Sequence, residues 1–346
     1  MLKLECFKAG KGDSFLLTWG ETQGHNLLID SGSEGTYRFI RPRLANEAKL
    51  HAILITHVDY DHIGGFFKLL ADADYELDKR LLVFMNTPRL ILAPSTSNLV
   101  GIDHGIEFEQ LLHKMGLRIA PLYLGMDAGN LLELSGGLTL QILSPPSFVV
   151  DELLRKWTAS TIYQQYQAEN QQQNNKVTVQ ETELAIAAAI LAKPPKPHQW
   201  EDDLLNSSSI AFIAQHNGNK ILFLADANPV LIANELATLG FTKEKPLVVD
   251  LLKISHHGSR HNTTKELLEL INCNQYLIST DSSGPYYHPA RDILILISEH
   301  GRPDKNTQLT IYSNYELDLE RLLTADEQKN LNFQFQEIAY LDFPDK

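Results

Sequence analysis

The sequence contains few cysteines and no long apolar segment. Cys6 and Cys273 are the only cysteines among 346 residues, and so few fit a reducing compartment better than a disulfide-rich secreted scaffold. No run approaches the roughly 18 apolar residues that a helix needs to cross a bilayer, and the N-terminus lacks the apolar core of a signal peptide. These absences predict a soluble, cytoplasmic protein without a membrane-spanning segment.

Basic residues are scarce relative to acidic ones. Lys and Arg number 30 against 43 Asp and Glu, so the formal net charge is −13. Proteins that bind nucleic acid unaided usually present basic surface, and this balance therefore disfavours an unassisted, high-affinity nucleic-acid binder. It does not exclude nucleic acid as a substrate, because bound divalent ions would reverse the local field of a carboxylate-lined cleft.

The chain otherwise has an ordinary globular composition, with 43% hydrophobic and 21% charged residues. Short apolar runs that end in polar or Gly-rich turns are typical of strands. Such runs occupy residues 15–19, 26–30, 51–55, 82–86, 90–93, 138–143, 209–214, 220–224, 248–254, 276–280, 308–312 and 333–341. Helical patterns occur near residues 37–47, 66–71 and 108–115.

Residues from about 150 to 205 differ from this strand-rich pattern. Two helical patterns are separated there by a polar tract, Glu169 to Asn175, and Lys193 to Pro197 forms a Pro-rich extended linker. The strand pattern then resumes. We therefore predict a single domain over residues 1–346 with a partly helical insertion at about 150–205.

A cluster of candidate metal ligands follows the apolar run at residues 51–55. The cluster consists of His57, Asp59, Asp61 and His62. Imidazole nitrogens and carboxylate oxygens are the ligands of Zn²⁺, Mn²⁺ and Fe²⁺. Alternate positions of an extended loop project from one side, so the first three side chains can converge, and His62 adds a ligand as a helix begins.

Two later strand ends carry further candidates. Asp226 ends the run at residues 220–224, where a carboxylate could bridge two metal ions or serve as a turn or cap. His256 and His257 end the run at residues 248–254, where they could be ligands or a core residue beside a surface residue. Three strand ends that carry ligands at one sheet edge favour a joint metal site.

These residues resemble the metallo-β-lactamase signature His-x-His-x-Asp-His, here His57 to His62 followed by Gly64 and Gly65. The pattern is closer still to the ComEC-type branch, named for the hydrolase domain of bacterial DNA-uptake channel proteins. The stretches similar to that branch are residues 11–17, 28–32, 56–65, 209–210, 224–227, 253–259 and 288–289. They cover roughly residues 4–75 and 205–300, without the insertion.

The resemblance implies an α/β fold, the αββα metallo-β-lactamase sandwich, with the site at one sheet edge and one or two divalent ions, Zn²⁺ or Mn²⁺. The implied ligands of a first metal position are His57 and Asp59, and those of a second are Asp61 and His62. Asp226 would bridge the two positions. His256 would complete the second position, and His257 is the competing assignment.

Two residues depart from the family pattern. Asp59 stands where the signature has its second histidine, which favours harder ions such as Mn²⁺. The usual third-motif histidine is also missing, because the matching stretch at residues 205–209 offers only Asn206. The first position is therefore expected to be weak or empty, and a single-ion site is an alternative.

The resemblance implies hydrolysis by metal-activated hydroxide, which Asp61 would help to orient. His288 or His257 could protonate the leaving group, and Lys253 could contact a phosphate or serve the structure. Asp13 and Asp30 are predicted to fix the ligand loops. The aromatic pair after residue 285 could stack on a base, although ordinary packing is the favoured interpretation: Tyr286 and Tyr287.

Three functions remain open from the sequence. The leading hypothesis is a phosphodiesterase that acts on nucleic acid or nucleotides. The second is a hydrolase of a small ester, lactone, amide or thioester, and the third is a degenerate metal-binding interaction module. The insertion at about 150–205 could be a lid, a surface for a protein partner or a contact in a homo-oligomer.

Overall fold

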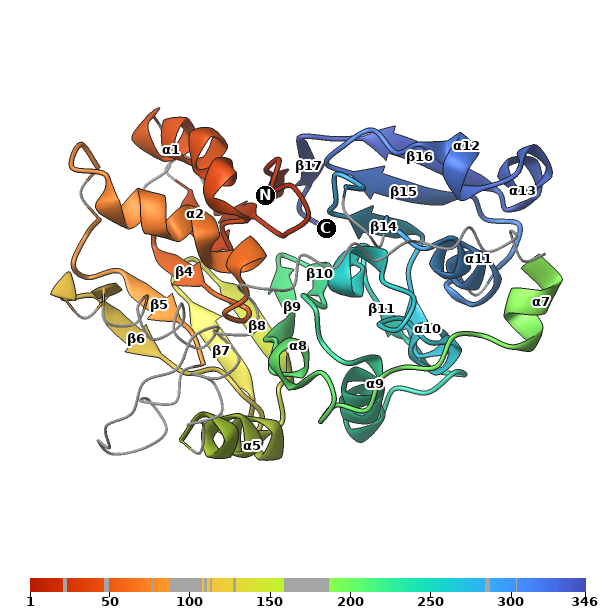
Figure 1. Cartoon of the computed structure of the whole chain (residues 1–346), viewed down its shortest axis with the longest axis horizontal. Helices are drawn as coiled ribbons and strands as arrows, with labels where there is room; N and C mark the ends of the chain where they lie inside the picture. Colours follow the sequence, from red (N-terminus) through yellow and green to blue (C-terminus); the bar gives the residue numbers. More distant parts are fainter. Residues whose placement is uncertain are drawn as a thin grey trace, which may run out of the picture.

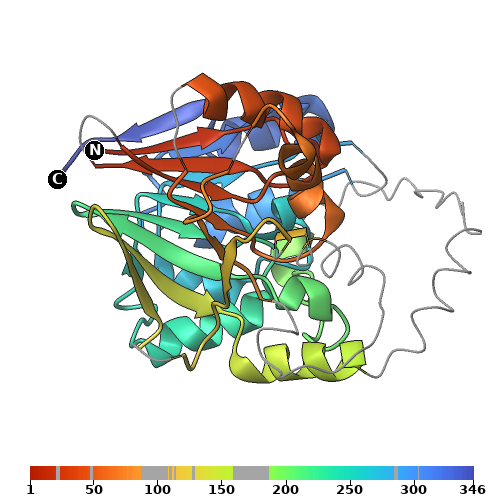
Figure 2. The same ribbon diagram turned by 90° about the vertical axis from the view of Figure 1, so that its left-hand side faces the viewer.

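The computed structural model describes residues 1–20, 24–46, 50–75, 77–86, 108, 111–112, 114–126, 129–158, 187–283, 287–302 and 304–346. Two large sheets lie face to face, and helices cover their outer faces (Figures 1 and 2). This αββα arrangement confirms the predicted fold class.

The first sheet has seven strands in the order β17-β1-β2-β3-β4-β5-β6. The strands are β1 (Leu2–Cys6), β2 (Phe15–Trp19), β3 (His25–Ile29), β4 (Ala52–Leu54), β5 (Leu82–Phe84), β6 (Arg118–Ala120) and β17 (Tyr340–Phe343). Strands β3 to β6 pair in parallel, whereas β17, β1, β2 and β3 pair antiparallel. Because β17 pairs with β1, the two ends of the chain lie side by side (Figure 1).

The second sheet has eight strands in the order β16-β15-β14-β12-β10-β9-β8-β7. The strands are β7 (Leu131–Leu134), β8 (Leu138–Ser144), β9 (Ala211–His216), β10 (Asn219–Phe223), β12 (Leu251–Lys253), β14 (Gln275–Ile278), β15 (Leu309–Ser313) and β16 (Phe333–Glu337). Strands β10 to β16 pair in parallel. A separate pair joins β11 (Leu247–Val248) to β13 (Ile271–Asn272).

Helices α1 (Tyr37–Asn46) and α2 (Tyr60–Ala71) cover the first sheet, and α9 (Pro229–Thr238), α10 (Lys265–Glu269) and α11 (Arg291–His300) cover the second. Figure 2 shows these helices outside the two sheets. The remaining helical elements are η1 (Glu34–Thr36), α5 (Ser147–Thr158), α7 (Ala187–Ala192), α8 (Leu204–Ser207), η2 (Ser255–Gly258), α12 (Leu319–Leu322) and α13 (Ala325–Asn330).

The core has three apolar layers, one between the sheets and one beneath each helix layer. Phe15 of the first sheet meets Phe223 of the second, with ring centroids 5.9 Å apart. Strands buried on both faces read as continuous apolar runs, which is why the sequence reveals most of them. None of the helices in the described part of the chain has the length and apolarity to span a membrane.

Several predicted elements have different limits in the structure. The helix predicted from residue 66 begins at Tyr60, so Asp61 and His62 lie in its first turn. The run at residues 248–254 divides between β11 and β12, which belong to different sheets. The run at residues 333–341 likewise divides between β16 and β17, at the edges of the two large sheets. The predicted strand at 90–93 and the polar tract at 169–175 lie outside the described residues.

The carboxyl ends of the parallel strands place the candidate ligands. In the first sheet, β3 is followed by Asp30 and β4 leads to His57. In the second sheet, β10 leads to Asp226, β12 leads to His257, and β14 is followed by Ser279. Since parallel strands end at the same edge of a sheet, these loops meet at one edge of the sandwich.

Candidate metal centre

His62 is held in place by a buried carboxylate. Its Nδ1 donates to Asp30 Oδ2 over 2.8 Å, and both side chains are fully buried. Asp30 also accepts from the backbone N–H of Thr56 at 2.8 Å and from its hydroxyl at 2.6 Å. The second ring nitrogen of His62, Nε2, therefore faces the sheet edge, 3.5 Å from Asp226 Oδ2.

Asp226 lies at the middle of the cluster. Its Oδ2 is 3.5 Å from Nε2 of His62, 3.6 Å from Nε2 of His257 and 3.8 Å from Nε2 of His256. Its Oδ1 is buried and has no hydrogen-bond partner among the described residues. The preceding residue, Ala225, adopts a positive φ of 47°, and this turn aims the carboxylate back across the strand ends.

His256 and His257 follow β12 in the left-handed backbone region, with φ of 47° and 56°. That conformation is costly for residues other than glycine and is concentrated at functional sites. The rings are 5.8 Å apart at an interplanar angle of 81°, so the two neighbours point in different directions. His257 is buried and its Nδ1 donates to Ser279 O over 2.8 Å, whereas His256 is 27% exposed and its Nδ1 lies 3.2 Å from Asn262 Oδ1.

The structure brings His257 rather than His256 together with the cluster on α2. Candidate ligand atoms of Asp61, His62 and His257 lie within 4.8 Å of one another. This grouping favours the competing assignment, in which His257 completes the second position. It also leaves His257 poorly placed to protonate a leaving group, because both of its ring nitrogens face partners inside the protein.

A buried ion pair between Lys253 and Asp13 adjoins His257. Lys253 Nζ pairs with Asp13, whose Oδ1 is 3.4 Å from His257 Nδ1, and Lys253 also donates to Ala225 O at 3.3 Å. Lys253 and Asp13 are both almost fully buried. The structural role considered for Lys253 is therefore favoured over a contact with substrate phosphate.

Gly12 fixes the loop that carries Asp13 against the start of α2. A Cβ at Gly12 would lie 1.7 Å from the backbone oxygen of Asp61, so only glycine permits this approach. Asp61 is half-buried in the first turn of α2, where a carboxylate also complements the helix dipole.

The charged groups of the cluster shift one another's pKa values even without a bound ion. Burial lowers the pKa of His257, but Asp226 and Asp13 outweigh it and raise the pKa to about 9. Burial likewise lowers the pKa of His62, and Asp226 and Asp30 raise it well above its usual value. The pKa of Asp226 is held well below normal, because the histidines overcome the opposing effect of burial. The carboxylates thus hold positive charge at this point.

His57, assigned by the resemblance to the first position, also lies close to Asp226. His57 Nε2 is 3.6 Å from Asp59 Oδ2, and candidate ligand atoms of His57, His62 and Asp226 lie within 4.8 Å of one another. Asp59 begins α2 without capping it and is 37% exposed at its side chain. Burial raises the pKa of Asp59, but His57 reverses this and holds it below its usual value.

Asn206 lies on α8, near this side of the cluster. Its Nδ2 donates to Asp203 Oδ2 over 3.1 Å, and its buried Oδ1 has no hydrogen-bond partner within the described residues. Asp203 acts electrostatically on His256, whose pKa is lowered overall, mainly by burial. Asp203 was not among the predicted site residues, because the acidic run Glu201 to Asp203 before a four-residue helix gives no signal that identifies it.

His288 lies beside His256, with ring centroids 5.8 Å apart. It is half-buried, and burial followed by the neighbouring histidines lowers its pKa to about 3. A neutral His288 can donate or accept a hydrogen bond near neutral pH, but it does not carry a proton ready for transfer. Tyr287 is 47% exposed with the Arg321 guanidinium 4.6 Å from its ring centre, and Tyr286 lies outside the described residues.

The residues present fit a divalent metal ion. Nε2 of His57, His62 and His257 is buried in each case and has no hydrogen-bond partner in the part of the chain that the structure describes. Such groups are costly to bury unless something binds them. Imidazole and carboxylate donors that converge in this way are the chemistry of Zn²⁺ and Mn²⁺ sites.

Two supporting residues could have been found by extending the strand-end argument. Ser279 follows β14 directly, as Asp30 follows β3, and its backbone oxygen anchors His257. Asn262 lies in the loop after the histidine pair, anchors His256, and donates to Asp226 O over 3.2 Å.

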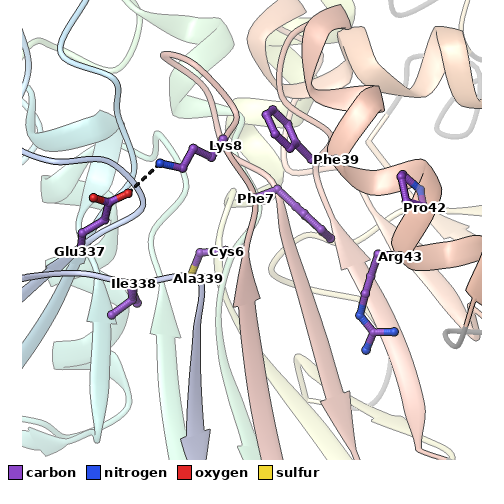
Figure 3. Close-up of a pocket in the computed structure, with 9 residues that line it drawn as sticks. All are labelled: Cys6, Phe7, Lys8, Phe39, Pro42, Arg43, Glu337, Ile338 and Ala339. Atoms are coloured by element: carbon purple, nitrogen blue, oxygen red, sulfur yellow. Dashed lines mark hydrogen bonds and ion pairs between the residues drawn. The ribbon is translucent and has the colours of Figure 1, made fainter.

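A separate pocket lies between α1 and the segment that joins β16 to β17 (Figure 3). Lys8 Nζ and Glu337 Oε1 form an ion pair of 2.6 Å at one side of it. Its lining residues are Cys6, Phe7, Lys8, Phe39, Pro42, Arg43, Glu337, Ile338 and Ala339. None of them belongs to the candidate metal centre.

Residues 8–117 match the family model of the Metallo-beta-lactamase superfamily. The fold is that of this superfamily. The matched segment contains the first half of the metal centre, from Asp13 to His62. A search of curated protein sequences finds no match to the chain.

Solved structures with this fold are similar to the chain at low sequence identity. The metallo-beta-lactamase fold protein YhfI from Bacillus subtilis is 10% identical over 99% of this chain and 100% of that one, with a TM-score of 0.45. Zn(2+)-bound PqqB from Methylobacterium extorquens is 10% identical over 99% and 100%, with a TM-score of 0.42. A long form RNase Z from yeast is 12% identical over 96% and 43%, with a TM-score of 0.40.

Proposed function

We propose that this protein is a metal-dependent hydrolase and that it cleaves phosphodiesters of nucleic acid or nucleotides. The observation that carries the proposal is the meeting of imidazoles at Asp226 Oδ2, with Nε2 of His62 at 3.5 Å and Nε2 of His257 at 3.6 Å. These groups come from three separate strand ends, and each imidazole is fixed by a partner on its other nitrogen. Orientation of this kind is typical of metal ligands.

The distances between candidate ligand atoms support the following assignment of the ligand sets. The second position is assigned to Asp61, His62 and His257, whose candidate ligand atoms lie within 4.8 Å of one another. The first position is assigned to His57 and Asp59, whose side chains are 3.6 Å apart. Asp226 serves both. His257 thus replaces His256 in the second set, and it is no longer a candidate proton donor.

Bound divalent ions would lower the pKa of a water molecule and polarise a phosphoryl oxygen. Asp61 lies in the first turn of α2, where its carboxylate can accept a hydrogen bond from the attacking water and orient it. His288, half-buried next to His256, would donate a hydrogen bond to the leaving oxygen. Asp13, Asp30 and Lys253 would act through the ligands that they hold.

The choice of a phosphodiester rests on the resemblance to the ComEC-type branch. Tyr287 adds support, because this residue is 47% exposed one position before His288, with the Arg321 guanidinium 4.6 Å from its ring centre. An exposed ring at this place offers a surface on which a nucleobase can stack. The alternative, hydrolysis of a small ester, lactone, amide or thioester, would use the same ligands, but the attacked atom would be a carbonyl carbon instead of phosphorus.

The test measures metal content and diesterase activity on the same preparation. The protein would be purified without chelator, its metal determined, and hydrolysis of bis-p-nitrophenyl phosphate followed with and without added Mn²⁺. We expect bound metal and activity in the wild type, and loss of activity in Asp61→Ala. Asp342→Ala, an exposed carboxylate on β17, is the matched control and should behave as the wild type.

The other outcomes separate the alternatives. Bound metal without diesterase activity would move the assignment to ester, lactone, amide or thioester substrates. Absence of metal, with no activity when Mn²⁺ is supplied, would favour the degenerate interaction module.

A further inference from the structure

The first metal position, as assigned under the proposed function, lacks one ligand. The stretch at residues 205–209 has no histidine, and Asp59 has replaced another. His57, Asp59 and the shared Asp226 therefore supply three side chains and only one imidazole. The second position, by contrast, has two imidazoles and two carboxylates, from Asp61, His62, His257 and Asp226.

His256 is the remaining imidazole that faces the shared carboxylate. Its Nε2 is 3.8 Å from Asp226 Oδ2, close to the 3.5 Å and 3.6 Å of His62 and His257. Its ring plane is tilted by 81° from that of His257, and the Nδ1 atoms of the two rings have different partners, Asn262 and Ser279.

The ring of His256 is oriented as that of a ligand. Asn262 Oδ1 lies 3.2 Å from Nδ1, and Asn262 Nδ2 donates to the backbone oxygen of Asp226 at 3.2 Å. Because the Asn262 amide nitrogen is used as a donor, its oxygen accepts from Nδ1–H of His256. The lone pair of His256 then lies on Nε2, which is the atom that faces Asp226.

The candidate ligand atoms that group with Asp61 and His62 include those of His257 but not those of His256, which leaves His256 available to the first position. His256 is also 27% exposed, as expected on the open side, where Asp59 is 37% exposed.

We infer that His256 completes the first metal position and takes over the function of the missing third-motif histidine. The first position then consists of His57, Asp59, His256 and Asp226. Both positions thereby have two imidazoles and two carboxylates, one of which they share. The position that the sequence predicts to be weak or empty is accordingly able to hold an ion.

The test counts ions bound to the full-length protein. Wild type and His256→Ala would be equilibrated with Mn²⁺ at a fixed free concentration, and bound metal measured by elemental analysis and electron paramagnetic resonance. We expect two ions in the wild type and one in His256→Ala, with binding of the lost ion weakened at least about tenfold. The spin coupling between two Mn²⁺ ions that share Asp226 should disappear in the variant.

Two further variants guard against a trivial loss of folding. His256→Asn keeps a residue type that tolerates the positive φ of 47° and should also bind one ion. His300→Ala removes a histidine at the end of α11, outside the metal centre, and should bind two. The metal-free variants should unfold at the same temperature as the metal-free wild type.

Three results would overturn the inference while leaving the second position in place. They are two ions with unchanged affinity in both His256 variants, a single ion in the wild type, or loss of an ion in Asn206→Ala but not in the His256 variants. Failure of the proposed function is distinguishable. Without a metal centre the wild type would bind no ion at all, and a metal centre with another substrate would leave the ion counts unchanged but show no hydrolysis of bis-p-nitrophenyl phosphate.

Discussion

The two pairs of histidines around Asp226 are anchored by different kinds of partner. In the second position, Nδ1 of His62 donates to the Asp30 carboxylate and Nδ1 of His257 to the Ser279 backbone oxygen, each over 2.8 Å. In the first position, His57 Nδ1 meets the Thr56 hydroxyl at 3.1 Å. His256, the fourth first-position ligand that we infer, meets a side-chain amide at 3.2 Å.

The difference has a consequence for metal binding. A carboxylate on the far nitrogen raises the basicity of an imidazole and fixes its ring, whereas a hydroxyl or an amide does so weakly. The second-position histidines are also buried, while His256 is 27% exposed. We therefore expect the second position to retain its ion more firmly than the first.

The largest effect should come from Asp226, the residue common to both positions. Asp226→Asn keeps the size of the side chain but removes the charge that faces the three Nε2 atoms. We expect diesterase activity to fall by about 1000-fold or more, together with loss of bound metal. Activity within tenfold of the wild type, measured at saturating Mn²⁺, would contradict the central place given to this carboxylate.

A pair of supporting variants compares the two positions directly. Asp30→Asn removes the charged partner of His62 and should weaken the tighter ion by roughly 10- to 100-fold. Asn262→Ala removes the neutral partner of His256 and should weaken the other ion by less than about tenfold. Competition titrations with a chromophoric chelator would measure both, and equal losses would show that the anchors do not distinguish the positions.

The loop at Gly12, which packs against the start of α2, should tolerate no larger side chain. Gly12→Ala would place a Cβ 1.7 Å from the Asp61 backbone oxygen, so the loop or the start of α2 must shift. We expect a loss of unfolding free energy of about 2 kcal/mol or more, seen in chemical denaturation. Gly35→Ala is the matched control, because its Cβ would meet no atom within 4 Å, and it should change little.

The sequence predicted the fold well where strands are continuous apolar runs. It failed where a run crosses from one sheet to another, as between β16 and β17, because hydropathy does not record which sheet a residue joins. It also missed β1, although Leu2 to Cys6 alternates apolar and polar residues as a strand with one buried face does. Turn residues usually mark the start of a strand in a sequence, and none precedes Leu2.

The candidate site was predicted to the level of strand ends but not of individual atoms. The dense spacing from His57 to His62 indicated metal chemistry by residue type alone. The choice between His256 and His257 depends on two successive positive φ values, which separate the directions of adjacent rings and leave no trace in the sequence. The sequence left open whether Lys253 contacts a phosphate or serves the structure. Its burial against Asp13, which favours the structural role, comes from tertiary packing.

The last expected effect concerns pH, and it also separates the two positions. In the metal-free protein the pKa of His257 is raised to about 9 from 6.5, so a metal ion must displace a proton there at neutral pH. The pKa of His256 is lowered instead, so little proton competition is expected from His256 above pH 6.5.

Affinity at the second position should therefore rise between pH 6.5 and about 9, by no more than about tenfold per pH unit for each proton displaced, while affinity at the first changes less. Metal-free stability should follow the opposite course. A raised folded-state pKa stabilises the protein fully below 6.5, and this contribution is lost as the pH rises towards 9. Calorimetric titrations in buffers of different ionisation enthalpy would count the released protons. Equal proton release on binding of the two ions would contradict the predicted difference in proton competition between the two positions.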